Sequence, residues 1–135
     1  MIAPMTTIDL GRPVQGDVID LILEDHRRFE DLMRTLRDAS ADRDAARAAF
    51  SELHVAHARA EEEVVYPKLR RKQAITAHEQ EHGEEEHAEG NEALLAVLEL
   101  KGTDTQAFDD AVDKLSEAIN HHLAEEELTI LNPAR

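Results

Sequence analysis

The 135-residue chain contains no cysteine and no tryptophan, and glycine, proline and aromatic residues are scarce. The lack of cysteine excludes disulfides, zinc–thiolate sites, iron–sulfur clusters and a cysteine nucleophile. Any bound metal must therefore be held by nitrogen and oxygen atoms. No apolar run reaches the roughly 18 residues that span a membrane, and the amino terminus lacks the layout of a secretory signal. We expect a soluble, cytoplasmic protein.

Positive charge is also scarce, because 30 acidic residues stand against 15 basic ones and the formal net charge is −15. Such a chain repels phosphate backbones and anionic lipid, so nucleic acid and membranes are not expected partners. The excess of carboxylates suits a cation site, although a solvated acidic surface explains most individual glutamates. Phosphate-loop, dinucleotide and nucleophile-elbow motifs are absent from the sequence.

Alanine, leucine, glutamate and arginine dominate the composition, and all four favour helices. The sequence predicts an all-α fold, with an irregular lead-in over residues 1–16 and an antiparallel up-down four-helix bundle over residues 17–135. Helices are predicted at about residues 17–38, 42–72, 77–101 and 105–131. We expect Asp17 to cap the first helix, Pro67 to bend the second and Gly102 to cap the end of the third.

Eight histidines are spread along the chain, and a histidine taken alone is most often a surface or capping residue. At 100° per residue, however, one histidine in each predicted helix falls on the apolar stripe. The four inward histidines are His26, His57, His87 and His122. His57 shares its face with Phe50, Leu53 and Val64, whereas His78, His82 and His121 fall on polar faces.

Two inward histidines are followed one turn later by an inward glutamate, as His57/Glu61 and His122/Glu126. This spacing makes the two side chains neighbours on one helix face, about 5 to 6 Å apart at Cβ. Four imidazoles and two carboxylates suit iron, manganese or zinc. Two ions are favoured over one, because each carboxylate can bridge a pair of cations. Buried His–Glu hydrogen bonds without metal, or a different helical register, are the alternative explanations.

The order of these residues resembles that of the hemerythrin-like, or HHE, cation-binding domain family: a lone His, H-x-x-x-E, a lone His and a second H-x-x-x-E. The most specific match is HVAHARAEEEVVYPKL at 54–69; LEDHRRFEDLM, EEEHAEGNEALLAVLEL and INHHLAEEELTILNP complete it. The resemblance implies a centre of two iron ions, oxo- or hydroxo-bridged, with manganese or zinc as alternatives and an open position for a small molecule. The metal ligands it implies are His26, His57, Glu61, His87, His122 and Glu126.

The third predicted helix departs from the oxygen-carrying members of that family, which place two histidines one turn apart there. The residues one turn either side of His87 are Gly83 and Asn91. This departure favours redox or sensing chemistry over reversible oxygen carriage. His54 or His82 could supply a fifth nitrogen.

The sequence leads to three functional hypotheses. The first is a non-haem di-iron protein that binds or processes dioxygen, nitric oxide or hydrogen peroxide, with catalase-like turnover as one form. The second is a non-enzymatic iron or oxygen sensor, or an iron store, in which the metal orders the bundle. The third is a metal-free helical interaction module.

The expected partner is a small-molecule ligand, and the chain is expected to be a monomer or a weak homodimer. Tyr66, just before Pro67, is either a hydrogen-bond donor behind the ligands or a packing residue.

Overall fold

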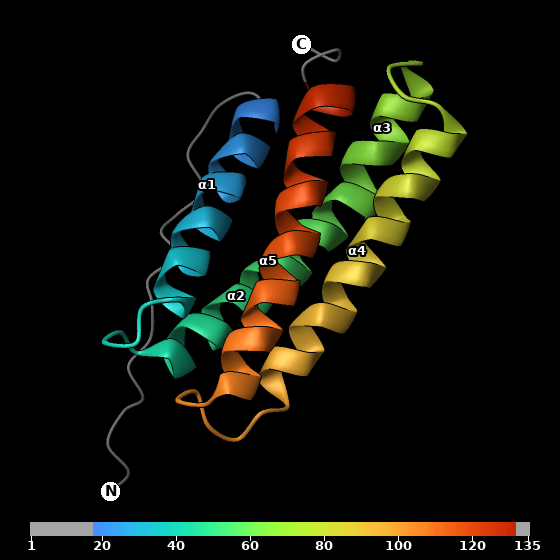
Figure 1. The fold of residues 1–135 in the computed structure, drawn as a ribbon. Helices are drawn as coiled ribbons and strands as arrows, with labels where there is room; N and C mark the ends of the chain where they lie inside the picture. The colour runs from blue at the N-terminus through green and yellow to red at the C-terminus, as the bar shows by residue number, and fades with distance from the viewer. Residues whose placement is uncertain (1–17, 132–135) are drawn as a thin grey trace, which may run out of the picture.

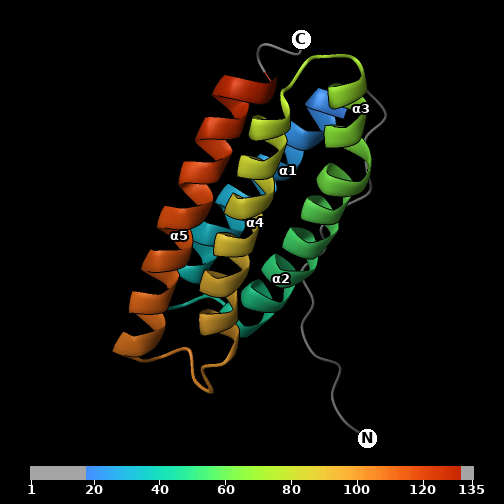
Figure 2. The same cartoon turned by 90° about the vertical axis from the view of Figure 1, so that its right-hand side faces the viewer.

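The computed structural model describes residues 18–131; the predicted lead-in and the Asp17 cap lie outside the described residues. Helices α1 (Val18–Leu36), α2 (Arg43–Ala60), α3 (Tyr66–Arg71), α4 (Ala77–Leu98) and α5 (Gln106–Glu126) follow in order. A π-helical segment, η1 (Glu61–Val65), joins α2 to α3, and a second, η2 (Glu127–Leu131), extends α5. Figures 1 and 2 show four long rods running alternately up and down, with α2, η1 and α3 forming one of them. The predicted all-α four-helix bundle is confirmed.

Side-chain caps explain why three of the helices begin where they do. The Asp42 side chain accepts a hydrogen bond from the Ala45 N–H at the start of α2. Thr76 and Glu79 form a reciprocal capping box at the start of α4, and Thr105 accepts from the Phe108 N–H at the start of α5. Each cap satisfies a backbone donor that the first turn of a helix leaves without a partner.

Two details of the predicted helices are wrong. Helix α4 ends at Leu98 with Glu99 as its C-cap, so Gly102 lies beyond it in the following loop and does not cap it. Val64, which the helical wheel places on the inward face with His57, is 61% exposed, and Val65 is buried instead. The reason is η1, in which the Tyr66 N–H donates to the Glu61 carbonyl five residues back. This wider turn delays the inward position by one residue.

The apolar interior is divided into two clusters along the bundle. The larger contains Phe29, Phe50, Phe108 and Leu115, and the smaller, towards the other end, contains Ile22, Val65, Tyr66 and Ile130. Along each rod, the inward histidine stands between or beside residues of these clusters. The fold therefore places a polar layer inside the bundle, closed off by apolar side chains on both sides. Within residues 18–131, no helix has the length and apolar character required to traverse a lipid bilayer.

Candidate metal centre

The structure brings all six predicted ligands together in the polar layer. None of them is more than 6% exposed, although each can carry a charge. Buried ionisable groups are costly unless they are paired or bind a metal ion. We call these residues the buried His–Glu cluster: His26, His57, Glu61, His87, His122 and Glu126.

Glu61, at the start of η1, is the meeting point of two imidazoles from different helices. Its Oε1 atom lies 3.0 Å from Nε2 of His57, one turn earlier on α2, and 3.0 Å from Nε2 of His87 on α4. One carboxylate oxygen thus links the first H-x-x-x-E pair to one of the lone histidines.

Glu126, at the end of α5, repeats this arrangement on the other side. Its Oε1 atom lies 3.1 Å from Nε2 of His26 on α1, and its Oε2 atom lies 3.3 Å from Nε2 of His122. The four inward imidazoles therefore all present Nε2 to the interior, and the two carboxylates stand among them.

The imidazoles form two pairs. The ring centroids of His26 and His57 are 5.4 Å apart, and those of His87 and His122 are 4.7 Å apart. The ligand atoms fall into two overlapping groups, each lying within 4.8 Å and sharing Glu126. One group is Glu61, His87, His122 and Glu126, and the other is His26, His57 and Glu126. Two groups of this size, joined by a common carboxylate, match two neighbouring cations.

Two of the histidines also contact a carboxylate through Nδ1, the ring nitrogen that faces away from the centre of the cluster. Nδ1 of His57 lies 2.9 Å from Asp25 Oδ2, and Nδ1 of His122 lies 3.1 Å from Glu86 Oε1. A hydrogen bond from Nδ1–H to a carboxylate leaves Nε2 as the ligating atom and increases its basicity.

The other two histidines have carboxylates behind them at a longer distance. Nδ1 of His26 is 3.6 Å from Glu127, and Nδ1 of His87 is 3.6 Å from Glu62. Each of these glutamates directly follows a glutamate of the buried His–Glu cluster, so the doublets Glu61-Glu62 and Glu126-Glu127 serve both sides of an imidazole.

The carboxylates shift the ionisation of the histidines they contact. Burial lowers the pKa of His57, but Glu61 and Asp25 outweigh burial and raise that pKa to about 10. Burial also lowers the pKa of His122, and hydrogen bonds with Glu126 and Glu86 raise it to about 9. Burial raises the pKa of Glu126, yet its bonds to histidines hold it well below the usual range. Without metal, protons on these imidazoles supply the positive charge that the carboxylates require.

Orphaned atoms inside the cluster show that it suits a cation. Glu61 Oε2 is buried without a hydrogen-bond partner, and His57 Nε2 and His122 Nε2 face carboxylate oxygens at 3.0 Å and 3.3 Å without forming well-aligned hydrogen bonds. A buried polar atom left in this way costs about 1–3 kcal/mol. Imidazole nitrogen and carboxylate oxygen are the donors that iron, manganese and zinc accept. The residues present therefore fit a pair of such ions.

Tyr66 combines the two roles that the sequence left open. It is fully buried, its Oη donates to Glu126 Oε2 at 2.5 Å, and its ring stacks on His87 at a centroid distance of 6.0 Å. Burial and the charges of Glu61 and Glu126 raise the pKa of Tyr66, which keeps the phenol protonated as a donor. Tyr66 is thus both packed against the cluster and hydrogen-bonded to it.

Neither candidate for a fifth nitrogen joins a group of ligand atoms with the buried His–Glu cluster in the described residues. His54 is buried, but its ring lies 6.5 Å from that of His87 and packs beside Phe29 and Phe50. Burial, followed by the charge of His87, lowers the pKa of His54 to about 4. His82 is 43% exposed at its side chain and lies 2.8 Å from Glu125 on α5.

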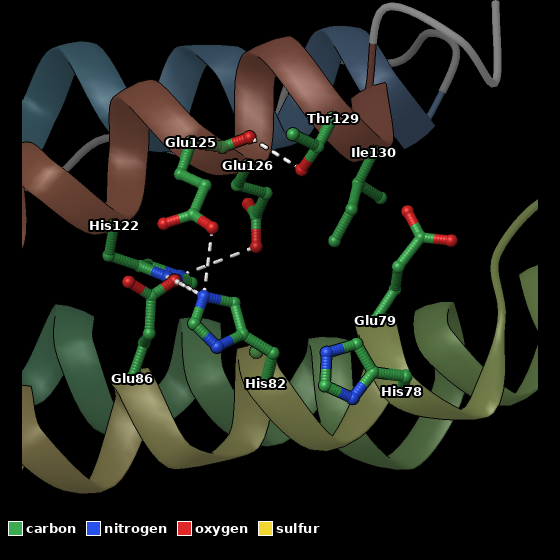
Figure 3. Close-up of a pocket in the computed structure, with 10 residues that line it drawn as sticks. His78, Glu79, His82, Glu86, His122, Glu125, Glu126, Thr129 and Ile130 are labelled. Atoms are coloured by element: carbon green, nitrogen blue, oxygen red, sulfur yellow. Dashed lines mark hydrogen bonds and ion pairs between the residues drawn. The ribbon is translucent and has the colours of Figure 1, made fainter.

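A pocket of about 270 Å³ between α4 and α5 reaches the cluster from outside. Its lining includes the buried His122 and Glu126 together with the more exposed His82 and Glu125. Figure 3 shows His82 and Glu86 projecting from α4 towards the side chains of α5.

Residues 17–133 match the family model described as the hemerythrin HHE cation binding domain. No curated protein and no solved structure shows a significant match to the chain.

Proposed function

Since the chain belongs to the hemerythrin HHE cation-binding domain family, we propose that it is a non-haem di-iron protein that binds or processes a small oxidant. The observation that carries this proposal is the convergence of four Nε2 atoms on two buried carboxylates, in two overlapping groups of ligand atoms. In this proposal His26 and His57 would hold one iron, His87 and His122 would hold the other, and Glu61 and Glu126 would supply carboxylate oxygens.

Bound iron supplies reversible redox change and open positions for a small molecule such as dioxygen, nitric oxide or hydrogen peroxide. The pocket of about 270 Å³ admits molecules of that size to His122 and Glu126. The surrounding apolar clusters limit the access of bulk water, which strengthens electrostatic interactions within the site. Catalase-like turnover of peroxide falls within this proposal.

The protein's own side chains contribute charge, orientation and a proton donor. Glu61 and Glu126 offset cationic charge, while Asp25 and Glu86 fix the rotation and tautomer of the imidazoles they contact. The Tyr66 hydroxyl lies 2.5 Å from Glu126 Oε2 and donates its proton to it. Tyr66 therefore holds Glu126 in place and keeps a phenolic proton at the edge of the cluster.

A non-enzymatic sensor or store is the second candidate, and the charged interior favours it. Buried imidazoles and carboxylates whose charges a bound cation would balance couple metal binding to the order of the bundle. In that case, chelation would remove much of the helical signal and thermal stability, and the iron-loaded protein would not turn over peroxide.

Metal analysis of the purified protein, combined with its ultraviolet-visible spectrum before and after peroxide, tests the proposal. About two irons per chain after anaerobic ferrous loading, with charge-transfer bands that respond to peroxide, would support it. A protein that neither contains iron nor takes it up would contradict it and favour His–Glu pairs without a metal.

A further inference from the structure

A second set of donor atoms lies outside the buried His–Glu cluster, on the facing sides of α4 and α5. His82 Nε2 is 2.8 Å from Glu125 Oε1 and 3.6 Å from Glu86 Oε1. The ligand atoms of these three residues fall within 4.8 Å of one another. His121 Nε2 adds a fourth donor, 3.0 Å from Glu125 Oε2 and 3.3 Å from Glu86 Oε2.

The spacing in these two helices repeats that of the buried motifs. His82 and Glu86 are four residues apart on α4, and His121 and Glu125 are four residues apart on α5. The His121/Glu125 pair precedes His122/Glu126 by one residue on α5. The first residue of each doublet therefore belongs to the outer pair, and the second belongs to the buried pair. Each helix thus presents an imidazole and a carboxylate to the other across the interface.

Glu86 connects the outer donors to the buried cluster. It is only 7% exposed, and its ion-pair partners are the imidazoles of His82, His121 and His122. Its Oε1 atom accepts from His122 Nδ1 at 3.1 Å. An ion next to Glu86 would therefore lie directly behind a ligand of the buried cluster.

The pocket between α4 and α5 supplies an independent observation, because it joins the two sets of residues. Its lining includes His82, Glu86 and Glu125 as well as the buried His122 and Glu126. The residues of the buried cluster are at most 6% exposed, so an ion must reach them through a gap in the bundle. This pocket provides such a gap, and donor atoms stand at its more exposed side.

We propose that His82, Glu86, His121 and Glu125 form an outer binding site for one divalent transition-metal ion, which receives ferrous iron from solvent and passes it inward. Mixed imidazole and carboxylate donors suit Fe²⁺, Mn²⁺ and Zn²⁺. The two carboxylates offset the charge of a divalent ion. The His82 and His121 side chains are 43% and 69% exposed, so an ion can reach them with part of its hydration shell. The inward transfer rests on the proposed function, whereas binding at the outer site does not.

Zinc binding tests the outer site. The unsubstituted chain, first loaded anaerobically with ferrous iron, is dialysed against Zn²⁺, and both metals are counted. We expect one zinc beyond the two irons, and in the double variant H82A/E125Q we expect zinc affinity to fall at least about tenfold with iron content unchanged. The matched control is H78A/E79Q, which alters residues that line the same pocket but do not belong to the donor group. No additional zinc, or equal zinc binding in H82A/E125Q, would overturn the outer site.

Anaerobic stopped-flow uptake of ferrous iron by the metal-free protein tests the transfer. We expect H82A/E125Q to take up iron about tenfold more slowly, because a cleft lined by negative charge raises the association rate of cations by about tenfold or more. The variant should reach the same final iron content. H78A/E79Q should load at the unsubstituted rate. If H82A/E125Q takes up iron as fast as H78A/E79Q, the proposed transfer of iron from the outer site to the buried cluster is contradicted. If the unsubstituted chain takes up no iron, the proposed function fails; if it holds two irons and no outer zinc, only the outer site fails.

Discussion

Gly83 on α4 and Tyr66 at the start of α3 occupy one tightly filled space, in which a Cβ atom at position 83 would lie 2.9 Å from the Tyr66 hydroxyl oxygen. That hydroxyl is 2.5 Å from Glu126, so the absence of a side chain at Gly83 allows Tyr66 to reach the buried cluster. In the sequence, Gly83 and Asn91 are the two residues one turn from His87, and neither is the second histidine that oxygen-carrying members of the family have there. The structure shows that a side chain there would displace the tyrosine.

The substitution Gly83→Ala should therefore move Tyr66 away from Glu126. Loss of a buried hydrogen bond costs about 1–3 kcal/mol, and the higher helix propensity of alanine returns up to about 1 kcal/mol. We expect a net loss of unfolding free energy in urea titrations of the metal-free protein. Gly102→Ala is the control, because nothing lies within 4 Å of a Cβ atom built there. A G83A protein as stable as the unsubstituted chain would show that the contact is not required.

Glu61→Gln should remove most of the bound iron. The amide keeps the volume of the side chain but loses the negative charge that two Nε2 atoms approach at 3.0 Å. Iron per chain, measured after anaerobic loading and desalting, should fall well below that of the unsubstituted protein. Glu63→Gln is the matched control, since Glu63 is exposed and pairs with Arg59 instead. Equal iron contents in the two variants would exclude Glu61 as a ligand.

Asp25→Asn should weaken metal binding without removing a ligand. Asp25 accepts from His57 Nδ1 at 2.9 Å, and loss of a carboxylate behind a metal-bound histidine typically costs about 10–100-fold in affinity. Competition with a chelator of known affinity measures the change. Asp31→Asn serves as the control on the same helix, because Asp31 is exposed and pairs with Arg34. An unchanged affinity in D25N would mean that Asp25 does not support the centre.

Metal binding should release protons at neutral pH. The pKa values of about 10 for His57 and about 9 for His122 mean that both imidazoles carry a second proton in the metal-free protein at pH 7. A ligating imidazole must give up that proton, so about two protons should leave per chain, and affinity should fall as pH falls. Titration calorimetry of anaerobic ferrous binding in buffers of different ionisation enthalpy counts them. Binding without proton release would contradict these ionisation states.

The same shifts predict how the metal-free protein responds to alkali. Because both folded pKa values exceed the ordinary value of 6.5, the stability they contribute is present below pH 6.5 and is lost as pH rises through about 9 to 10. Thermal melts should show the metal-free chain weakening from about pH 6.5 to about pH 10, the interval between the unfolded and folded pKa values. Iron-loaded protein should lose less stability over that interval. An equal loss in both forms would point to other groups.

His54 should make the protein sensitive to acid. Its folded pKa of about 4 lies below the ordinary 6.5, so the unfolded chain binds a proton that the folded chain does not, and stability falls between those values. The difference corresponds to about 3 kcal/mol. His54→Leu should lose that much less stability than the unsubstituted protein between pH 6.5 and 4 in urea titrations of metal-free samples. His78→Leu, at an exposed position on α4, should behave like the unsubstituted chain. Equal acid sensitivity of H54L and H78L would contradict the prediction.

Helical periodicity was enough to predict the four-rod architecture and the inward position of the six cluster residues. Apolar residues recur at helical spacing, and the side chains of Asp42, Thr76 and Thr105 mark helix starts. A histidine on an apolar stripe, such as His26 or His87, must enter the interior whenever its helix packs, so burial follows from local periodicity.

Contacts between side chains on different helices could not be predicted in this way, because they depend on how the helices pack. The approach of Glu61 to His87, the support of His57 by Asp25 and the bond from Tyr66 to Glu126 each join different helices or distant segments. The outer donors depend on tertiary structure for the same reason: His82/Glu86 and His121/Glu125 show the H-x-x-x-E spacing, but only the packing of α4 against α5 brings the two pairs together. Helical periodicity sets the direction of a side chain around its own axis. The distances between helices and the extra residue in η1 depend on how the whole bundle packs.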